Sequence, residues 1–195
     1  MPLGANKAAI MGVAGVSTAD VVLLDDTDYS NAATASITSG IDSTYGEYIF
    51  KFYNINPATD DVHFSFQMNV AGGSGYNETM TTTFINADHN EADDDTNFQY
   101  VAGHDQAQGT AFQDIATDVG NGSDESCAGE LHLFNPSSTT YVTHFHSRMQ
   151  VYRQDNYASD HFAAGYFNLT GAVDEIQFKM SSGNFDGTIK MWGVK

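Results

Sequence analysis

Apolar and polar residues alternate most regularly between Val62 and Val70. Every second residue of this segment, VHFSFQMNV, is apolar, which predicts a strand with one apolar and one polar face. The preceding segment, Glu47–Ile55, is apolar on both faces, which predicts a more central strand or one covered by an arm or a neighbour. Residues Asn54–Asp61 predict a turn between the two, so we expect them to pair as antiparallel neighbours.

The rest of the chain follows the same pattern of short strands between turns. Gly, Pro, Ser and Asn clusters such as Asn135–Ser137 and Ser181–Asn184 separate the segments. Ala111–Val119 is the one place where we expect one or two helical turns. Together these segments predict an all-β fold, an antiparallel β-sandwich with a jelly-roll-like arrangement. The further strands are expected at Val21–Leu24, Ala33–Thr38, Thr79–Ile85, Glu130–Phe134, Thr140–Tyr152, His161–Phe167, Glu175–Met180 and Thr188–Val194.

The first twenty residues, MPLGANKAAIMGVAGVSTAD, differ from the remainder. They are small and apolar, and Gly4, Gly12 and Gly15 interrupt any helical stripe. We therefore divide the chain into an extended N-terminal arm, residues 1–20, and a single sandwich domain, residues 21–195. Such an arm can lie across a neighbouring subunit by strand addition. Its expected partner-binding residues are Leu3, Ala8, Ile10, Met11, Val13 and Val16.

The arm also mimics a short secretory signal. Lys7 precedes an apolar run, Ala8–Val16, which is followed by the small residues Ser17–Ala19. The basic region consists of a single lysine and the apolar run holds two glycines, so we interpret the segment as part of the mature protein. No run in the sequence is long enough to span a bilayer.

The formal net charge is −18, from 25 acidic and 7 basic residues in a chain of 195. No Lys or Arg occurs between Phe52 and Ser147. Such a field repels phosphate backbones and anionic lipids, which excludes nucleic acid and membrane surfaces as expected partners. Cys127 is the only cysteine, so no intrachain disulfide forms, and we expect an inert thiol because no His or Lys stands beside it in the sequence.

Residues Asp88–Asn97, DHNEADDDTN, form the most polar segment. Asp93, Asp95 and Asn97 have the alternate spacing with which an EF-hand loop begins, and their oxygens suit Ca²⁺. Phe98 then stands where that loop needs glycine, and His104 replaces its final glutamate. A calcium site of another kind and a solvated loop both remain open; no other cofactor is expected.

Three histidines are the second candidate metal set. His144 and His146 share one face of a predicted strand, and the turn Asn135–Thr139 brings His132 of the preceding strand opposite them. Three imidazoles on one face can bind a transition metal. The alternative is that they are outward-facing polar positions of a hairpin, since the sequence does not fix the register.

No motif identifies a reaction, so we expect a protein that is not an enzyme. A Gly-x-Ser-x-Gly motif is missing, and Gly72–Gly75 lacks the lysine and helix of a phosphate loop. Exposed aromatic residues can stack on sugars, which leaves glycan binding open. The candidates are Tyr76, Tyr100, Tyr152, Tyr157 and Trp192.

The two ends of the chain, MPLGANKAAIMGVAG and IQFKMSSGNFDGTIKMWGVK, and the central GELHLFNPSSTTYVTHFHSR carry a resemblance. They resemble small uncharacterised virion proteins of marine tailed bacteriophages, and the closing segment looks like the final β-hairpin of phage head and tail appendage proteins. The resemblance implies a virion component. It carries over no catalytic residue and does not distinguish the head from the tail.

We therefore expect a structural protein on the exterior of a virion, anchored by residues 1–20 and displaying an acidic sandwich. Head decoration or cement and a short fibre or appendage are the two forms it can take. Its expected partners are other virion proteins and further copies of itself, with a trimer expected from analogy. The alternative is a receptor- or glycan-binding module at a tail tip.

Overall fold

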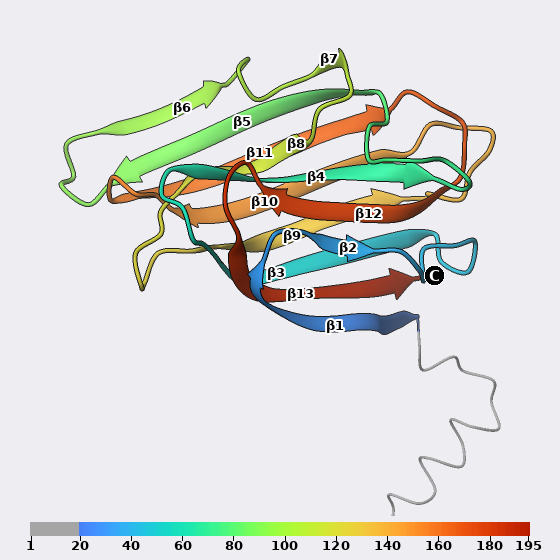
Figure 1. Ribbon diagram of the computed structural model, residues 1–195. Coiled ribbons are helices and arrows are strands. Elements are labelled where there is room, and N and C mark those ends of the chain that lie inside the picture. The colour runs from blue at the N-terminus through green and yellow to red at the C-terminus, as the bar shows by residue number, and fades with distance from the viewer. Residues whose placement is uncertain (1–19) are drawn as a thin grey trace, which may run out of the picture.

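The computed structural model describes residues 20–195, which form two packed antiparallel sheets (Figure 1). The all-β sandwich is therefore confirmed. The small sheet has the order β2 (Ala35–Ile37), β12 (Val173–Met180), β4 (Val62–Val70) and β8 (Gln113–Val119). The large sheet has the order β1 (Val21–Ala32), β13 (Phe185–Val194), β3 (Glu47–Pro57), β9 (Cys127–Phe134), β10 (His144–Tyr152), β11 (Tyr157–Phe167), β5 (Met80–Asn90) and β6 (Thr96–Tyr100), and β7 (Ala107–Gly109) also pairs with β5.

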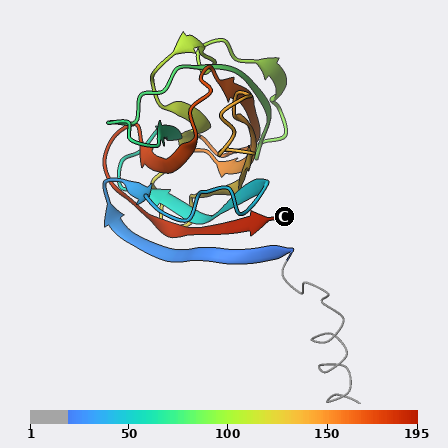
Figure 2. The same cartoon turned by 90° about the vertical axis from the view of Figure 1, so that its right-hand side faces the viewer.

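The large sheet curves around the small one. The view along the sandwich shows β1 and β13 at one end of this curve and the green strands β5 and β6 at the other (Figure 2). The inner face of the large sheet therefore packs on the small sheet, and its outer face turns away. The strand β1 is an edge strand, because its only partner among the described strands is β13.

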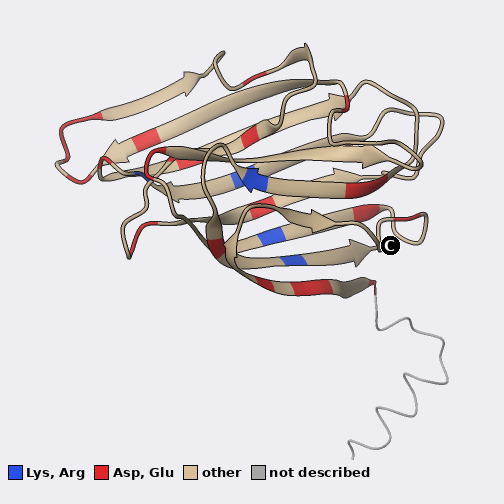
Figure 3. Ribbon diagram, viewed as in Figure 1, with Lys and Arg blue, Asp and Glu red and all other residues tan. Residues whose placement is uncertain are grey.

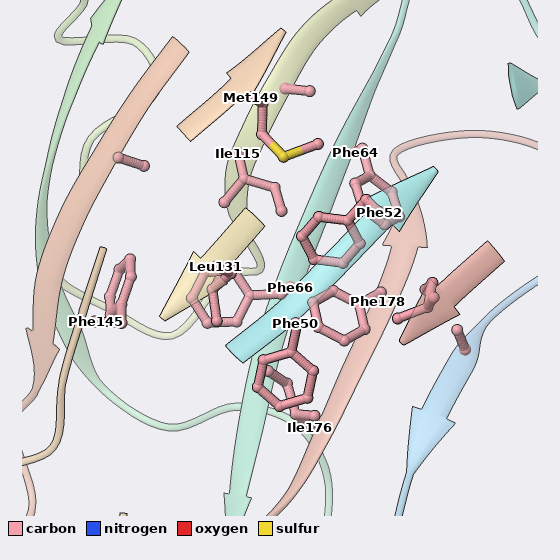
Figure 4. Packing of buried hydrophobic residues seen from close by; sticks show 14 of the residues in the cluster. Phe50, Phe52, Phe64, Phe66, Ile115, Leu131, Phe145, Met149, Ile176 and Phe178 are labelled. Carbon is pink, nitrogen blue, oxygen red and sulfur yellow. The ribbon is translucent and has the colours of Figure 1, made fainter. Parts of the chain in front are cut away.

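Phenylalanine rings from both sheets form the centre of the core (Figure 4). Phe178 of β12 lies 5.5 Å from Phe50 and 5.1 Å from Phe52, both on β3 of the opposite sheet, between ring centroids. Within its own sheet it lies 5.9 Å from Phe64 and 6.4 Å from Phe66. All five rings are almost completely buried, so Phe178 joins the two sheets at their centre.

The strand β3 occupies the interior position that its sequence predicted. It pairs with β13 on one side and β9 on the other. Tyr48, Phe50 and Phe52 are buried against the small sheet, whereas Lys51 and Tyr53 lie on the outer face. The Tyr48 hydroxyl also donates to the backbone carbonyl of Asp42 at 2.9 Å, so its polar end is satisfied.

The predicted pairing of β3 with β4 is wrong. The connection through Asn54–Asp61 carries the chain from the large sheet to the small one, where β4 pairs with β12 and β8. Asn54 has a φ of 51° at a bulge within β3, and Asp61 has a φ of 58° immediately before β4, where the chain changes direction. A turn signal marks the change of direction but not the sheet that the chain enters.

The polar face of β4 is buried as well as its apolar face. Ser65, Gln67 and Asn69 are each less than a tenth exposed. The Gln67 side-chain amide donates to the carbonyl oxygens of Glu78 at 3.0 Å and Ala111 at 3.1 Å. The segments that follow β4 and β7 therefore cover this face with hydrogen-bonding groups in place of water.

The helical turns expected at Ala111–Val119 are absent, because Gln113–Val119 forms strand β8. Ile115, Ala116 and Val119 of β8 are fully buried. Two register shifts interrupt the pairing of β8 with β4, and Asp118 has a φ of 56°. Because of these bulges, inward and outward positions do not alternate strictly along β8. Its sequence therefore lacks the period-two pattern that predicts a strand.

Cys127 is buried at the start of β9, where its side chain is 1% exposed. Burial raises the pKa of this thiol to about 12. The reactive thiolate is therefore suppressed at neutral pH, as expected for an inert cysteine.

Replacing Phe178 should destabilise the sandwich more than replacing a single peripheral ring. We expect Phe178→Ala to lower the free energy of unfolding by about 3–5 kcal/mol, because it leaves a cavity between four other rings. Urea denaturation followed by tryptophan fluorescence measures this change. The exposed Tyr141→Ala serves as the control, and a Phe178→Ala loss no larger than the control's would contradict the central role of this ring.

His161 of β11 is a titratable side chain in the core, where it is 0% exposed. Its Nδ1 accepts a hydrogen bond of 3.3 Å from the backbone N–H of Thr117. Burial lowers its pKa to about 4 from an ordinary value of 6.5, which outweighs the opposing effect of the Asp118 carboxylate. The other charged groups that act on it are Arg153, His104 and Asp160.

Because the folded pKa lies below the unfolded one, the stabilising effect of neutral His161 is complete above pH 6.5 and is lost as the pH falls toward 4. We expect the free energy of unfolding to fall by about 1–3 kcal/mol over this range through this residue. His161→Asn keeps an acceptor for Thr117 but does not titrate, so its unfolding free energy should depend less on pH. Equal pH slopes in the variant and the parent protein would refute this assignment.

Candidate functional site

Three adjoining hollows form a groove on the outer face of the large sheet, which we call the outer-face groove. The first hollow, of about 340 Å³, lies between Trp192 of β13 and Tyr53 of β3. The second, of about 440 Å³, shares Lys51 and Tyr53 with it and extends to Arg148 and Asp160. The third, also of about 440 Å³, shares Ala128 and Gln150 with the second and reaches β5. The groove thus crosses the strands from β13 to β5.

Small residues form the floor of the groove at its centre. Ala128 and Gly129 of β9 line the second hollow. A Cβ atom on Gly129 would lie 2.2 Å from the carbonyl oxygen of Arg148 and 2.7 Å from the Met149 sulfur. Glycine is therefore required at this position, where a side chain would point inward against Met149, and the small outward-facing Ala128 forms the floor.

Charged side chains of alternating sign cross the groove. Lys51, Glu130 and Arg148 occupy directly opposite positions on β3, β9 and β10. The Lys51 Nζ lies 3.5 Å from Glu130, and the Arg148 guanidinium binds Asp160 of β11 through both Nε, at 3.1 Å, and Nη2, at 2.6 Å. These are exposed pairs that add little stability, but each holds a long side chain in one orientation. The groove therefore presents fixed donors and acceptors.

Two exposed aromatic rings border these charges. Tyr53 and Phe162 are each 42% exposed. The Arg148 guanidinium carbon lies 5.1 Å from the centre of the Phe162 ring, and the Lys190 Nζ lies 5.8 Å from the centre of the Tyr53 ring. Each ring therefore contacts a cation and keeps part of its surface open. Exposed rings beside oriented polar groups are the combination that binds the apolar faces and hydroxyls of sugars.

The aromatic residues proposed from the sequence only partly belong to the groove. Trp192 and Tyr152 line it. Tyr76 instead donates to Glu175 at 3.1 Å, Tyr100 bonds Asp105, and Tyr157 donates to Asp95 at 2.8 Å. Tyr53 and Phe162 could not be predicted as a pair from the sequence, because only the strand register shows that they share a face with Arg148. Their one sequence signal is an aromatic residue at an outward position of a strand.

The structure brings two of the three predicted histidines together. His132 and His146 are directly opposite, with ring centroids 4.6 Å apart, whereas His144 is opposite Phe134 and packs 6.1 Å from Tyr166. The three imidazoles share one face of the sheet, but His144 lies at the next outward position along the strand, and the metal site stays a prediction. Partial burial, followed by the charge of His132, lowers the pKa of His146.

Both ring nitrogens of His132 face carboxylates. Its Nδ1 lies 2.5 Å from Glu47 and its Nε2 lies 3.4 Å from Glu130. This arrangement explains why His132 is held firmly on the outer face beside the groove. It places a histidine pair and two acids next to the Lys51–Glu130 ion pair.

The acidic segment lies at the hairpin between β5 and β6. Asp93 Oδ1 is 3.1 Å from His89 Nε2, and Asp95 accepts from the Tyr157 hydroxyl at 2.8 Å. Asn97 is already in β6, opposite Asp88. Each of the three residues thus has its own surroundings, and the calcium site stays a prediction.

The remaining partner-binding residues, Leu3, Ala8, Ile10, Met11, Val13 and Val16, lie outside the described residues. Within residues 20–195 no helix has the length and apolar character needed to cross a bilayer. Comparison with known proteins finds no protein-family model that matches the chain and no curated protein with a significant match. The case for a function therefore rests on the sequence and the geometry.

Proposed function

We propose that the chain is a non-enzymatic structural protein on the exterior of a tailed-phage virion, with residues 1–20 as the anchor. The observation that supports this most directly is where the chain enters the sandwich. Asp20 immediately precedes β1, the edge strand of the large sheet, and its carbonyl oxygen accepts from the backbone N–H of Lys195 at 3.0 Å. A segment that leaves from an edge can bind a neighbour without crossing the domain.

The distribution of charge agrees with an exposed position. Acidic residues are concentrated on β1 and on the hairpin between β5 and β6, at opposite edges of the large sheet (Figure 3). On β1, Asp26 pairs with Lys190 at 2.9 Å and Asp28 accepts from Thr188 at 2.6 Å. Charged edges repel unwanted strand pairing, so a dense array of copies stays soluble. We propose that copies of the chain form a closed oligomer, a trimer by analogy.

Deleting residues 1–20 should separate folding from assembly. Among residues 20–195, the buried core consists of side chains from Ala35 to Met191, so we expect the shortened protein to fold and remain soluble. It should no longer join particles when supplied to a phage that lacks the gene. Cosedimentation with particles measures incorporation, with the full chain as the positive control. A shortened chain that is incorporated as well as the full chain would refute the anchor.

We propose a second function, glycan binding, because of the outer-face groove. Tyr53 and Phe162 provide exposed rings, and the Lys51–Glu130 and Arg148–Asp160 pairs provide oriented donors and acceptors beside them. Sugar recognition needs both, since one face of a pyranose is apolar and its rim carries hydroxyls. A tail-tip receptor-binding module would have this character.

The test uses host surface polysaccharide and a glycan array with the full chain. If the groove binds sugar, Tyr53→Ala and Phe162→Ala should each weaken binding by about tenfold, which corresponds to one lost ring contact. Tyr141→Ala removes a ring that is 72% exposed but lies away from the groove, and it should have no effect. Undetectable binding by the parent protein, or equal losses in all three variants, would contradict the glycan function.

A further inference from the structure

Three side chains from separate parts of the sequence converge beside the small sheet. His63 is the second residue of β4, on its polar face, His104 lies between β6 and β7, and Asp114 is on β8. Each offers one nitrogen or oxygen atom, and these atoms lie within 4.8 Å of one another. No short sequence motif contains the three residues, so their proximity could not be predicted from the sequence.

Hydrogen bonds hold two of these groups in place. His104 Nδ1 lies 2.9 Å from Asp114 Oδ2, and the Ser65 hydroxyl donates to Asp114 Oδ1 at 2.9 Å. The 2.9 Å between His104 Nδ1 and Asp114 Oδ2 is close to the separation of two atoms that bind one Zn²⁺ ion at about 2.0–2.2 Å. An ion can therefore take the place of the proton between them, with Nδ1 and Oδ2 as its ligands.

His63 completes the group. Its ring lies 5.0 Å from that of His104, at an interplanar angle of 72°. Its Nδ1 is 3.3 Å from the backbone N of Asp118, at the long end of the hydrogen-bond range, so this contact is readily exchanged for a stronger one. The two imidazoles therefore stand edge to face, and each offers a nitrogen near Asp114.

The surroundings favour a cation. The side chains of His104 and Asp114 are 22% and 21% exposed, so an ion can reach them while most of the site is shielded from water. The Asp114 carboxylate supplies negative charge at the point where the three groups meet, which attracts a divalent cation.

We propose that His63, His104 and Asp114 form a binding site for a divalent first-row transition metal, with Zn²⁺ as the best fit. Two imidazoles and one carboxylate are borderline ligands that suit Zn²⁺, whereas Ca²⁺ and Mg²⁺ take oxygen ligands almost alone. Three protein ligands leave a coordination position for water. The ion would join β4, β8 and the segment between β6 and β7. It would thereby hold this segment in place over the polar face of β4.

The test uses the full chain without an affinity tag, freed of metal by a chelator. Zn²⁺ is titrated by calorimetry, and Co²⁺ is titrated by visible absorption, which reports nitrogen and oxygen ligation directly. We expect one equivalent of metal per chain. Zn²⁺ at a hundred times its Kd should also raise Tm by roughly 5–10 °C. Excess Ca²⁺ should not displace the bound Co²⁺.

The variants His63→Gln and His104→Gln should each weaken Zn²⁺ binding at least tenfold. The matched control, His132→Gln with His146→Gln, removes the histidine pair on the outer face and should bind as the parent does. Circular dichroism establishes that each variant is folded, and His63→Asn replaces any variant that is not. Absence of Zn²⁺ binding by the parent protein, or loss of binding in the control alone, would overturn the proposed site.

Discussion

Contact between aromatic rings of the two sheets is the interaction on which the rest of this structure depends. Phe178 of the small sheet lies against Phe50 and Phe52 of the large one, and all three are buried. Burial of such rings is the main favourable term available to a chain with this much charge. Because β3 and β12 are both interior strands of their sheets, this contact fixes how the sheets face each other.

The outer-face groove follows from that constraint. Once Phe50 and Phe52 face inward, the alternation of a strand places Lys51 and Tyr53 outward. Continuous pairing through β9, β10 and β11 then aligns Glu130, Arg148 and Phe162 with them. The groove has no separate scaffold, so its geometry is as rigid as the sheet that carries it.

The sequence predicted the fold class well, because the apolar residues that become buried recur at every second position of the strands. It placed His132 and His146 on one face for the same reason, although the connection between their strands extends over residues 135–143 and is longer than the predicted turn. It placed β4 next to β3 wrongly, because local turn chemistry does not specify which sheet follows. It could not bring His63, His104 and Asp114 together, because their proximity arises from strand order and from a loop that crosses β4.

The unequal width of the two sheets explains why a polar compartment exists inside a sandwich. Four strands cannot cover the inner face of a sheet that continues through β5 and β6. Segments between strands cover the part of the inner face that the small sheet leaves open. Their backbone groups must be hydrogen-bonded where they are buried. Gln67 and Gln113, both 0% exposed, meet this need: Gln113 accepts from Thr82 at 2.6 Å and donates to the carbonyl of His104 at 2.8 Å. The same bond positions the backbone of His104 near Asp114, so the need to satisfy buried polar groups also assembles the proposed metal ligands.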